Sequence, residues 1–177
     1  MMALPTTTLV LGGARSGKSS YAEQLVEVYE QGVYLATAPA AGDDAEMAER
    51  IQMHRDRRGP MWHTFEESLE LSEAITKLAR ADRPILVDCL TLWLSNLMFA
   101  ERDPEAATED LIRALSQSPG PVVLVSNEVG MGIVPENTLA RAFRDCAGRM
   151  NQIVAGAADR VIFVAAGLPL IMKDENT

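Results

Sequence analysis

A glycine-rich segment between an apolar run and a helical pattern constrains this chain more than any other part of its sequence. Its residues, Gly12, Gly13, Ala14, Arg15, Ser16, Gly17, Lys18 and Ser19, match the pattern G-x-x-x-x-G-K-[ST]. The preceding run Thr7–Leu11 indicates a buried strand, and Ser19–Glu30 has helical periodicity. Glycines let successive backbone N–H groups point at one anion, and a helix N-terminus adds partial positive charge. The segment therefore predicts a phosphate-binding loop and a bound nucleotide.

Three side chains supply the chemistry that such a loop needs. Lys18 would place a positive charge on the terminal phosphates, and the Ser19 hydroxyl would bind Mg²⁺. Asp88 ends the apolar run Pro84–Asp88, where a carboxylate can hold Mg²⁺ or one of its waters beside the loop. The alternative is that Asp88 caps the helix expected at Thr91–Phe99, and the two roles are compatible.

Apolar runs and helical patterns alternate along the rest of the chain. Continuously apolar strands separated by helices are typical of a mainly parallel sheet with helices on both faces. We therefore expect residues 1–177 to form a single α/β domain of the P-loop NTPase type. The expected strands are Thr7–Leu11, Val33–Ala36, Trp62–Phe65, Pro84–Asp88, Pro121–Ser126 and Val161–Ala165. The expected helices are Ser19–Glu30, Ala45–Arg57, Ser68–Arg80, Thr91–Phe99, Glu105–Leu115 and Thr138–Ala158.

Composition excludes several classes of protein. The 16 basic and 25 acidic side chains give a formal charge of −9, which disfavours a general nucleic-acid binder. The longest apolar stretch, Val161–Met172, is interrupted by glycine and proline and is shorter than the roughly 20 residues of a membrane span. Arg15 is the first basic residue, so no secretory signal is expected. Cys89 and Cys146 fall in apolar patterns, which favours two buried thiols in a reducing cytoplasm.

A histidine and a group of arginines form the second candidate site. His54 falls on the apolar stripe of the helix expected at Ala45–Arg57, a position more typical of a structural histidine. Four arginines surround it in an otherwise acidic protein: Arg50, Arg55, Arg57 and Arg58. They indicate either the solvated end of a helix or a triphosphate clamp beside a nucleophilic imidazole. The other histidine, His63, is interpreted as a strand residue.

Taken together, these residues resemble the bifunctional adenosylcobinamide kinase/adenosylcobinamide-phosphate guanylyltransferase family of cobalamin biosynthesis. The resemblance covers nearly the full length and rests on three segments and the ending Gly167–Leu170. The segments are Gly12–Ser19, Arg50–Arg58 and Val125–Asn137. The phosphate loop is generic, whereas the stretch Asn127–Asn137 is specific.

The resemblance implies two reactions. A nucleoside triphosphate phosphorylates the hydroxyl of the aminopropanol arm of adenosylcobinamide, and GTP then guanylylates a histidine. That GMP passes to adenosylcobinamide phosphate, giving adenosylcobinamide-GDP. GTP, ATP and Mg²⁺ are the implied cofactors, the two corrinoids are the implied substrates, and the family's assembly is a homotrimer.

The family's functional positions transfer onto this sequence residue by residue. His54 occupies the guanylylated position, and Met53 stands where some relatives have a second histidine. The resemblance also assigns nucleotide contacts outside the phosphate loop, to Ala36, Thr37, Ala38, Arg55, Asp56, Arg57, Arg58, Glu66 and Asp88. Asp88 is shorter than the glutamate of other relatives.

Two other functions fit parts of the pattern. A small P-loop kinase without guanylyltransferase activity would use the phosphate loop and arginines, with His54 structural. A nucleotide-gated interaction protein would bind GTP without turnover, and Asn127–Asn137 would contact its partner. If the chain is instead the bifunctional kinase/guanylyltransferase, the loop Asn127–Asn137 is a candidate corrinoid site, because it follows the carboxyl end of a strand. A tight structural crossover is the alternative.

Overall fold

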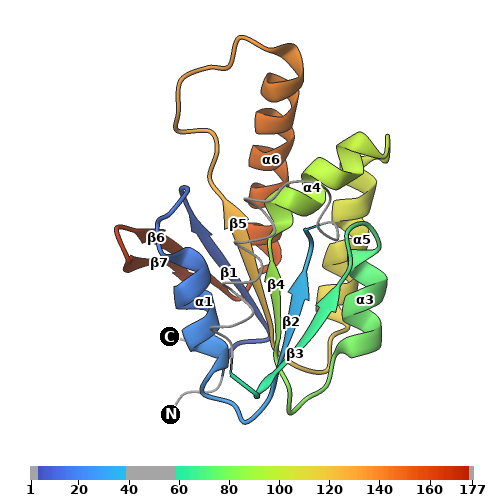
Figure 1. The fold of residues 1–177 in the computed structure, drawn as a ribbon, viewed down its shortest axis with the longest axis vertical. Coiled ribbons are helices and arrows are strands. Elements are labelled where there is room, and N and C mark those ends of the chain that lie inside the picture. Colours follow the sequence, from blue (N-terminus) through green and yellow to red (C-terminus); the bar gives the residue numbers. More distant parts are fainter. Residues whose placement is uncertain (1–3, 39–58, 176–177) are drawn as a thin grey trace.

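In the computed structural model, which describes residues 4–38 and 59–175, a seven-stranded sheet of order β3-β2-β4-β5-β1-β6-β7 runs through the molecule (Figure 1). The neighbouring strands from β3 to β6 pair in parallel, and β7 pairs antiparallel to β6. The strands are β1 (Thr7–Gly12), β2 (Gly32–Ala36), β3 (Trp62–Glu66), β4 (Ile85–Asp88), β5 (Val122–Asn127), β6 (Arg160–Ala165) and β7 (Leu168–Asp174). The predicted α/β fold with a mainly parallel sheet is confirmed.

Helices cover both faces of this sheet, as the sequence predicts. On one face α1 packs against β1, β4, β5 and β6. The other face carries α3, α4, α5 and α6, which pack against one another (Figure 1). Their bounds are α1 (Lys18–Val26), α3 (Leu71–Leu78), α4 (Leu90–Phe99), α5 (Pro104–Ser116) and α6 (Thr138–Ala157). The helix predicted at Ala45–Arg57 lies outside the described residues.

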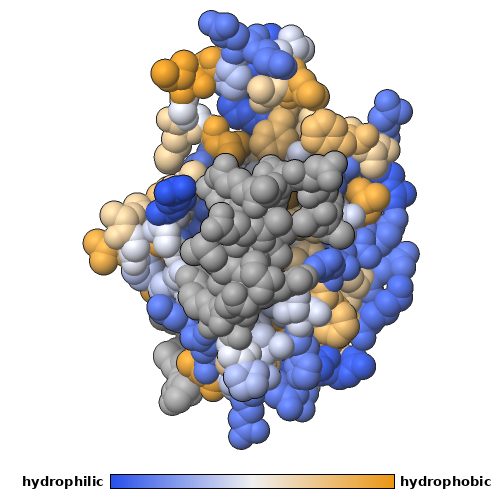
Figure 2. Space-filling model, in the orientation of Figure 1, coloured by the Kyte–Doolittle hydropathy of each residue, from blue (hydrophilic) through white to orange (hydrophobic). Residues whose placement is uncertain are grey.

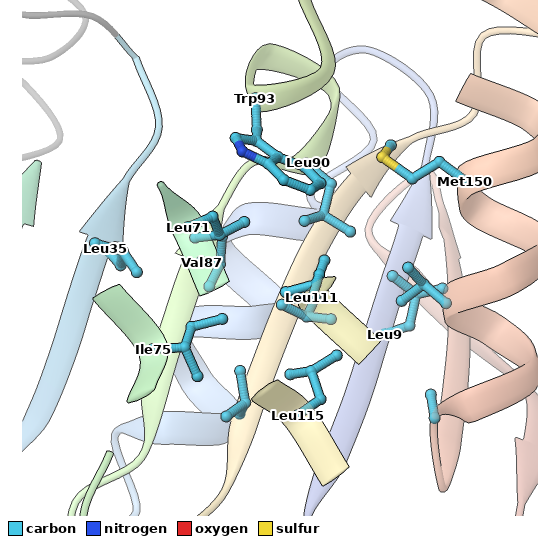
Figure 3. Packing of buried hydrophobic residues seen from close by; sticks show 14 of the residues in the cluster. Leu9, Leu35, Leu71, Ile75, Val87, Leu90, Trp93, Leu111, Leu115 and Met150 are labelled. Atoms are coloured by element: carbon cyan, nitrogen blue, oxygen red, sulfur yellow. The ribbon is translucent and has the colours of Figure 1, made fainter. Parts of the chain in front are cut away.

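The core is divided by the sheet into two layers, because neighbouring residues of a strand point to opposite faces. In β1, Leu9 and Leu11 belong to the larger layer, whereas Val10 belongs to the smaller layer beside α1. Figure 3 shows the larger layer, in which Trp93 of α4 and Met150 of α6 meet side chains of the strands. Burial on both faces explains why the central strands β4 and β5 are apolar along most of their length rather than at alternate positions.

The strand β7 was not predicted from the sequence. Gly167 and Pro169 interrupt the apolar run, so the last predicted strand ends at Ala165. In the structure the glycine lies in a tight turn, and the chain returns as the edge strand β7. Proline is tolerated there because an edge strand has backbone N–H groups that need no ladder partner.

The two cysteines differ in burial. Cys89 is 6% exposed, as expected, but Cys146 on α6 is only half-buried, so the prediction of two buried thiols is right for Cys89 alone. Among residues 4–38 and 59–175, no helix is both long enough and apolar enough to cross a membrane.

Candidate nucleotide-binding site

The phosphate loop connects the carboxyl end of β1 to the first turn of α1. Arg15 and Gly17 have positive φ angles of 56° and 94°. Alternation of left- and right-handed backbone turns successive N–H groups into a concave nest for an anion. The first N–H groups of α1 add donors, since they have no partner inside the helix. A cavity of about 620 Å³ opens over these groups and is lined by residues 14–20 and Asn127.

Gly12 lies where the loop leaves the sheet, at a position with no room for a side chain. A Cβ atom at this position would lie 2.5 Å from the carbonyl oxygen of Val164 and 2.5 Å from Ser16 Oγ. The turn between β6 and β7 also supports the loop from behind, because Gly167 N donates to Ser16 O over 2.8 Å. Gly167 therefore lies against the phosphate loop, although it is far from it in sequence.

Lys18 is largely buried at the base of the loop. It is 8% exposed, and its Nζ donates to Gly13 O at 3.1 Å. Burial lowers the pKa of Lys18, while the neighbouring Cys89 and Asp88 act in the opposite direction. A desolvated ammonium group interacts strongly with a phosphate that enters the loop.

Asp88 lies at the carboxyl end of β4 and is oriented by a tyrosine. Its Oδ2 accepts a hydrogen bond from the Tyr34 hydroxyl at 2.9 Å. The residue at the N-cap of α4 is Cys89, with no side-chain cap, so the alternative role of Asp88 as a helix cap is wrong. Its carboxylate turns toward β2 and the phosphate loop instead.

The oxygen atoms around the loop fit a magnesium ion that is shared with a nucleotide. No group of three or more His, Cys, Asp or Glu side chains in the described part of the chain could hold a metal by itself. Mg²⁺ in nucleotide sites is bound by one or two protein oxygens, by phosphates and by waters. Ser19 in the first turn of α1 and Asp88 at the end of β4 would supply the protein oxygens for such an arrangement, and their role as Mg²⁺ ligands stays a prediction.

Other predicted contacts lie along the same edge of the sheet. Ala36 is paired in register with Glu66 on one side and with Asp88 on the other, so three strands bring these residues into one row. Thr37 follows directly, but its hydroxyl donates to Cys89 O and accepts from Cys89 N, at 2.7 and 2.8 Å. The Thr37 side chain therefore connects the end of β2 to the start of α4 through these two hydrogen bonds. Nucleotide contacts by these residues, and by Ala38, stay predictions.

The histidine and arginines of the second candidate site lie outside the described residues. This applies to His54, Arg55, Asp56, Arg57 and Arg58, and to Arg50 as well. Their roles stay predictions.

Asn127 was named from the sequence only as the first residue of the candidate corrinoid loop Asn127–Asn137, and its place beside the phosphate loop was not predicted. It ends β5, pairs in register with Gly12, and lines the cavity over the loop. The signal was available, because a polar residue that ends a buried strand is the feature that singled out Asp88. The loop that follows exposes Met131, Ile133 and Val134, and Figure 2 shows apolar atoms along it at the top of the view.

A parallel sheet whose first strand leads through a glycine-rich loop into a helix, with an acid at the end of another strand, defines a P-loop nucleotide-binding protein. Solved structures with this fold include a Pyrococcus horikoshii OT3 protein, with TM-score 0.58, 9% identity and coverage of 97% of this chain and 88% of that one. The type III secretion ATPase EscN of enteropathogenic E. coli has TM-score 0.56 and 11% identity, over 92% of this chain and 43% of that one. At such identities the likeness concerns the fold alone.

Sequence comparison is more specific. The model of the family described as cobinamide kinase / cobinamide phosphate guanyltransferase (CobU) matches residues 8–172, and the chain belongs to this family. It is 47% identical to the bifunctional adenosylcobalamin biosynthesis protein CobP of Pseudomonas aeruginosa, over 94% of this chain and 97% of that protein. It is 48% identical to CobU of Salmonella typhimurium (93% and 98% covered) and 43% identical to CobU of Escherichia coli K12 (93% and 98%).

Proposed function

We propose that this protein phosphorylates adenosylcobinamide and then transfers GMP from GTP to the product, through a covalent intermediate on His54. The observation that carries the proposal is the phosphate loop with its buried Lys18 and neighbouring Asp88, in a chain that belongs to the cobinamide kinase/guanyltransferase family. The alternative, a P-loop kinase without guanylyltransferase activity, would use the same phosphate loop and the arginines, with His54 in a structural role.

The described residues account for the kinase step. The loop N–H groups and Lys18 bind and align the phosphates, and Asp88 and Ser19 would hold Mg²⁺, which neutralises charge as the phosphoryl group moves. The substrate hydroxyl oxygen forms a bond to the γ-phosphorus while the bond to the bridging oxygen breaks. The nucleoside diphosphate leaves, and the hydroxyl proton passes to solvent.

Guanylyl transfer uses His54 as the nucleophile. One imidazole nitrogen bonds to the α-phosphorus of GTP, pyrophosphate leaves, and the ring proton is lost to solvent. A phosphate oxygen of the corrinoid then bonds to this phosphorus as the bond to the imidazole breaks, and the departing ring takes a proton back from solvent. The covalent intermediate replaces one difficult transfer of GMP with two displacements, each of which has a lower barrier. The arginines from Arg50 to Arg58 would stabilise the triphosphate and favour a neutral, nucleophilic imidazole.

We further propose ATP or GTP as kinase donors, the cytoplasm as the compartment and a homotrimer as the assembly. Both cysteines are unpaired, in keeping with a reducing compartment. Four apolar side chains are exposed on the edge strand β7, which would suit a contact between subunits: Leu168, Leu170, Ile171 and Met172. We assign the corrinoid to the loop Asn127–Asn137, whose exposed apolar side chains would suit a macrocycle.

Intact-mass spectrometry tests the guanylyltransferase directly. The protein is incubated with GTP and Mg²⁺, and we expect a mass increase of one GMP that mild acid removes and that His54→Ala abolishes. His63→Ala is a matched control, because His63 is the chain's other histidine and lies exposed on β3. If GTP binds but no adduct forms, the histidine mechanism is wrong and the plain P-loop kinase replaces it.

A further inference from the structure

Asn127 approaches the phosphate loop from a different part of the chain. Among the described residues that line the cavity, it is the one outside the segment 14–20. It lies beside Gly12 in the sheet, and the next residue is fixed as well, because Glu128 N donates to Gly12 O at 3.1 Å. Its backbone position relative to the loop is therefore set by the sheet.

A chain of buried polar groups holds this residue from behind. Asn151 of α6 donates through Nδ2 to Asn127 O at 3.2 Å, and its Oδ1 accepts from Ser126 Oγ at 2.7 Å. Ser126 Oγ lies 3.4 Å from Thr91 Oγ1. Thr91 Oγ1 in turn accepts from Asn127 N at 2.7 Å and from Asn127 Nδ2 at 3.2 Å. Thr91, Ser126 and Asn151 are 7%, 0% and 6% exposed, so water does not compete for these groups.

The direction of each bond in this chain follows from counting protons. A backbone carbonyl only accepts, so Asn151 must present its NH₂ group to Asn127 O and its oxygen to Ser126. Ser126 then donates its one proton to Asn151, so the proton between Thr91 and Ser126 comes from Thr91. Thr91 has no proton left for an acceptor on Asn127. The amide of Asn127 must therefore face Thr91 with its nitrogen.

This assignment leaves the carbonyl oxygen of the Asn127 side chain facing away from Thr91. Nδ2 also contacts Cys89 Sγ at 3.9 Å, which further fixes that end of the amide. Within the part of the chain that the structure describes, no group donates to Oδ1, and this atom is not among the buried unsatisfied ones. It is therefore an oriented acceptor that solvent or a ligand can reach, on a residue that lines the cavity.

We propose that Asn127 Oδ1 accepts a hydrogen bond from the hydroxyl group that attacks the γ-phosphorus, and so aligns this alcohol for phosphoryl transfer. A carbonyl oxygen repels phosphate oxygens, which the loop N–H groups and Lys18 already bind, so its partner must be a donor. The amide is no base: it orients the O–H while the new O–P bond forms, and the proton leaves to solvent. This inference rests on the proposed function, because that function supplies the alcohol.

The test compares the two half-reactions in Asn127→Ala. Phosphorylation of adenosylcobinamide at saturating nucleotide is expected to fall about 10- to 100-fold, because the attacking oxygen is no longer aligned. Formation of the GMP adduct uses no substrate hydroxyl, so its rate and the nucleotide Kd should change by less than about twofold. Equal slowing of both reactions, together with a higher Mg²⁺ requirement, would mean that Oδ1 holds a metal-bound water, and would overturn the proposal. Unchanged phosphorylation would overturn it too.

A pair of substitutions at Thr91 provides independent evidence if Asn127→Ala folds poorly. Thr91→Val removes the acceptor that orients the amide and should slow phosphorylation selectively, whereas Thr91→Ser keeps the hydroxyl and should restore it. Equal rates in the two variants would contradict the proposal. The wild-type protein is assayed alongside: if it yields no phosphorylated corrinoid, the proposed function itself fails, whereas an active wild type matched by Asn127→Ala refutes only the role of Asn127.

Discussion

At the residue scale, Gly12 shows how a single missing side chain positions the phosphate loop. Gly12→Ala would press a methyl group against the backbone oxygen of Val164 and against Ser16, both 2.5 Å from the new atom. Because the backbone of β6 cannot move freely, we expect a loss of about 1–3 kcal/mol in the free energy of unfolding. Denaturant titration of the unliganded protein measures it. Gly13→Ala is the matched control, since nothing lies within 4 Å of its Cβ; equal losses would contradict the steric explanation.

Cys89 gives a pH dependence at the same scale. Burial, and next the charge of Asp88, raise the pKa of its thiol from 9.0 to about 11. Between these values the unfolded chain loses the thiol proton while the folded chain keeps it. The free energy of unfolding should therefore fall as pH rises from 9 to 11, by about 2–3 kcal/mol in total. Cys89→Ala should remove this decline and Cys146→Ala should not, as measured by urea titrations across that range.

The position of the phosphate loop could be predicted from the sequence because its residues are contiguous. The loop from Gly12 to Ser19 is one motif, and its place between strand and helix was predictable. Asn127 owes its orientation to Thr91 and Asn151, which lie 36 and 24 residues away in the chain. No local pattern reports such a network, because it exists only after the sheet has formed.

At the scale of elements, the hairpin of β6 and β7 supports the phosphate loop through its turn. Gly167 has a φ of 77°, a conformation that costs a side-chain-bearing residue about 1–2 kcal/mol. Gly167→Ala should destabilise the turn and, through the bond from Gly167 N to Ser16 O, weaken nucleotide binding several-fold. Calorimetric titration with GTP measures the effect. Ala166→Gly relaxes the neighbouring residue, whose φ is 52°, and should not weaken binding; an equal loss there would contradict this role.

The same hairpin shows why the elements were only partly predictable. Periodicity predicted twelve segments, and the eleven that fall on described residues each match an element; the long helix differs from its predicted range Thr138–Ala158 by a single residue. Helix ends governed by tertiary contacts were less accurate: α1 ends at Val26 rather than at Glu30. The strand β7 was missed because glycine and proline give the same signal in two situations. They occur where a sheet ends and also where the chain turns into an edge strand.

At the scale of the whole molecule, the edge strand β7 exposes a row of apolar side chains that could contact another subunit. Figure 2 shows apolar atoms over the hairpin of β6 and β7, and Leu170 and Ile171 are 63% and 59% exposed. If β7 contacts another subunit, as proposed, Leu170→Lys with Ile171→Lys should shift the protein toward the monomer in analytical ultracentrifugation. Val28→Lys is the control, an exposed apolar residue at 51% beyond α1. An unchanged assembly in the double variant would place the contact elsewhere.

The hydrogen bonds at the base of the segment 128–150 have a consequence for how the protein can vary. This segment leaves the sheet where Glu128 N donates to Gly12 O, and the chain is tied back where Asn151 Nδ2 donates to Asn127 O. Its two ends are thus joined to the same point of the molecule. Each doubling of a loop closed in this way costs only about 0.6 kcal/mol. Because residues 138–150 belong to the packed helix α6, this tolerance concerns the loop between Glu128 and Asn137, whose length could change at little cost to the fold beneath it.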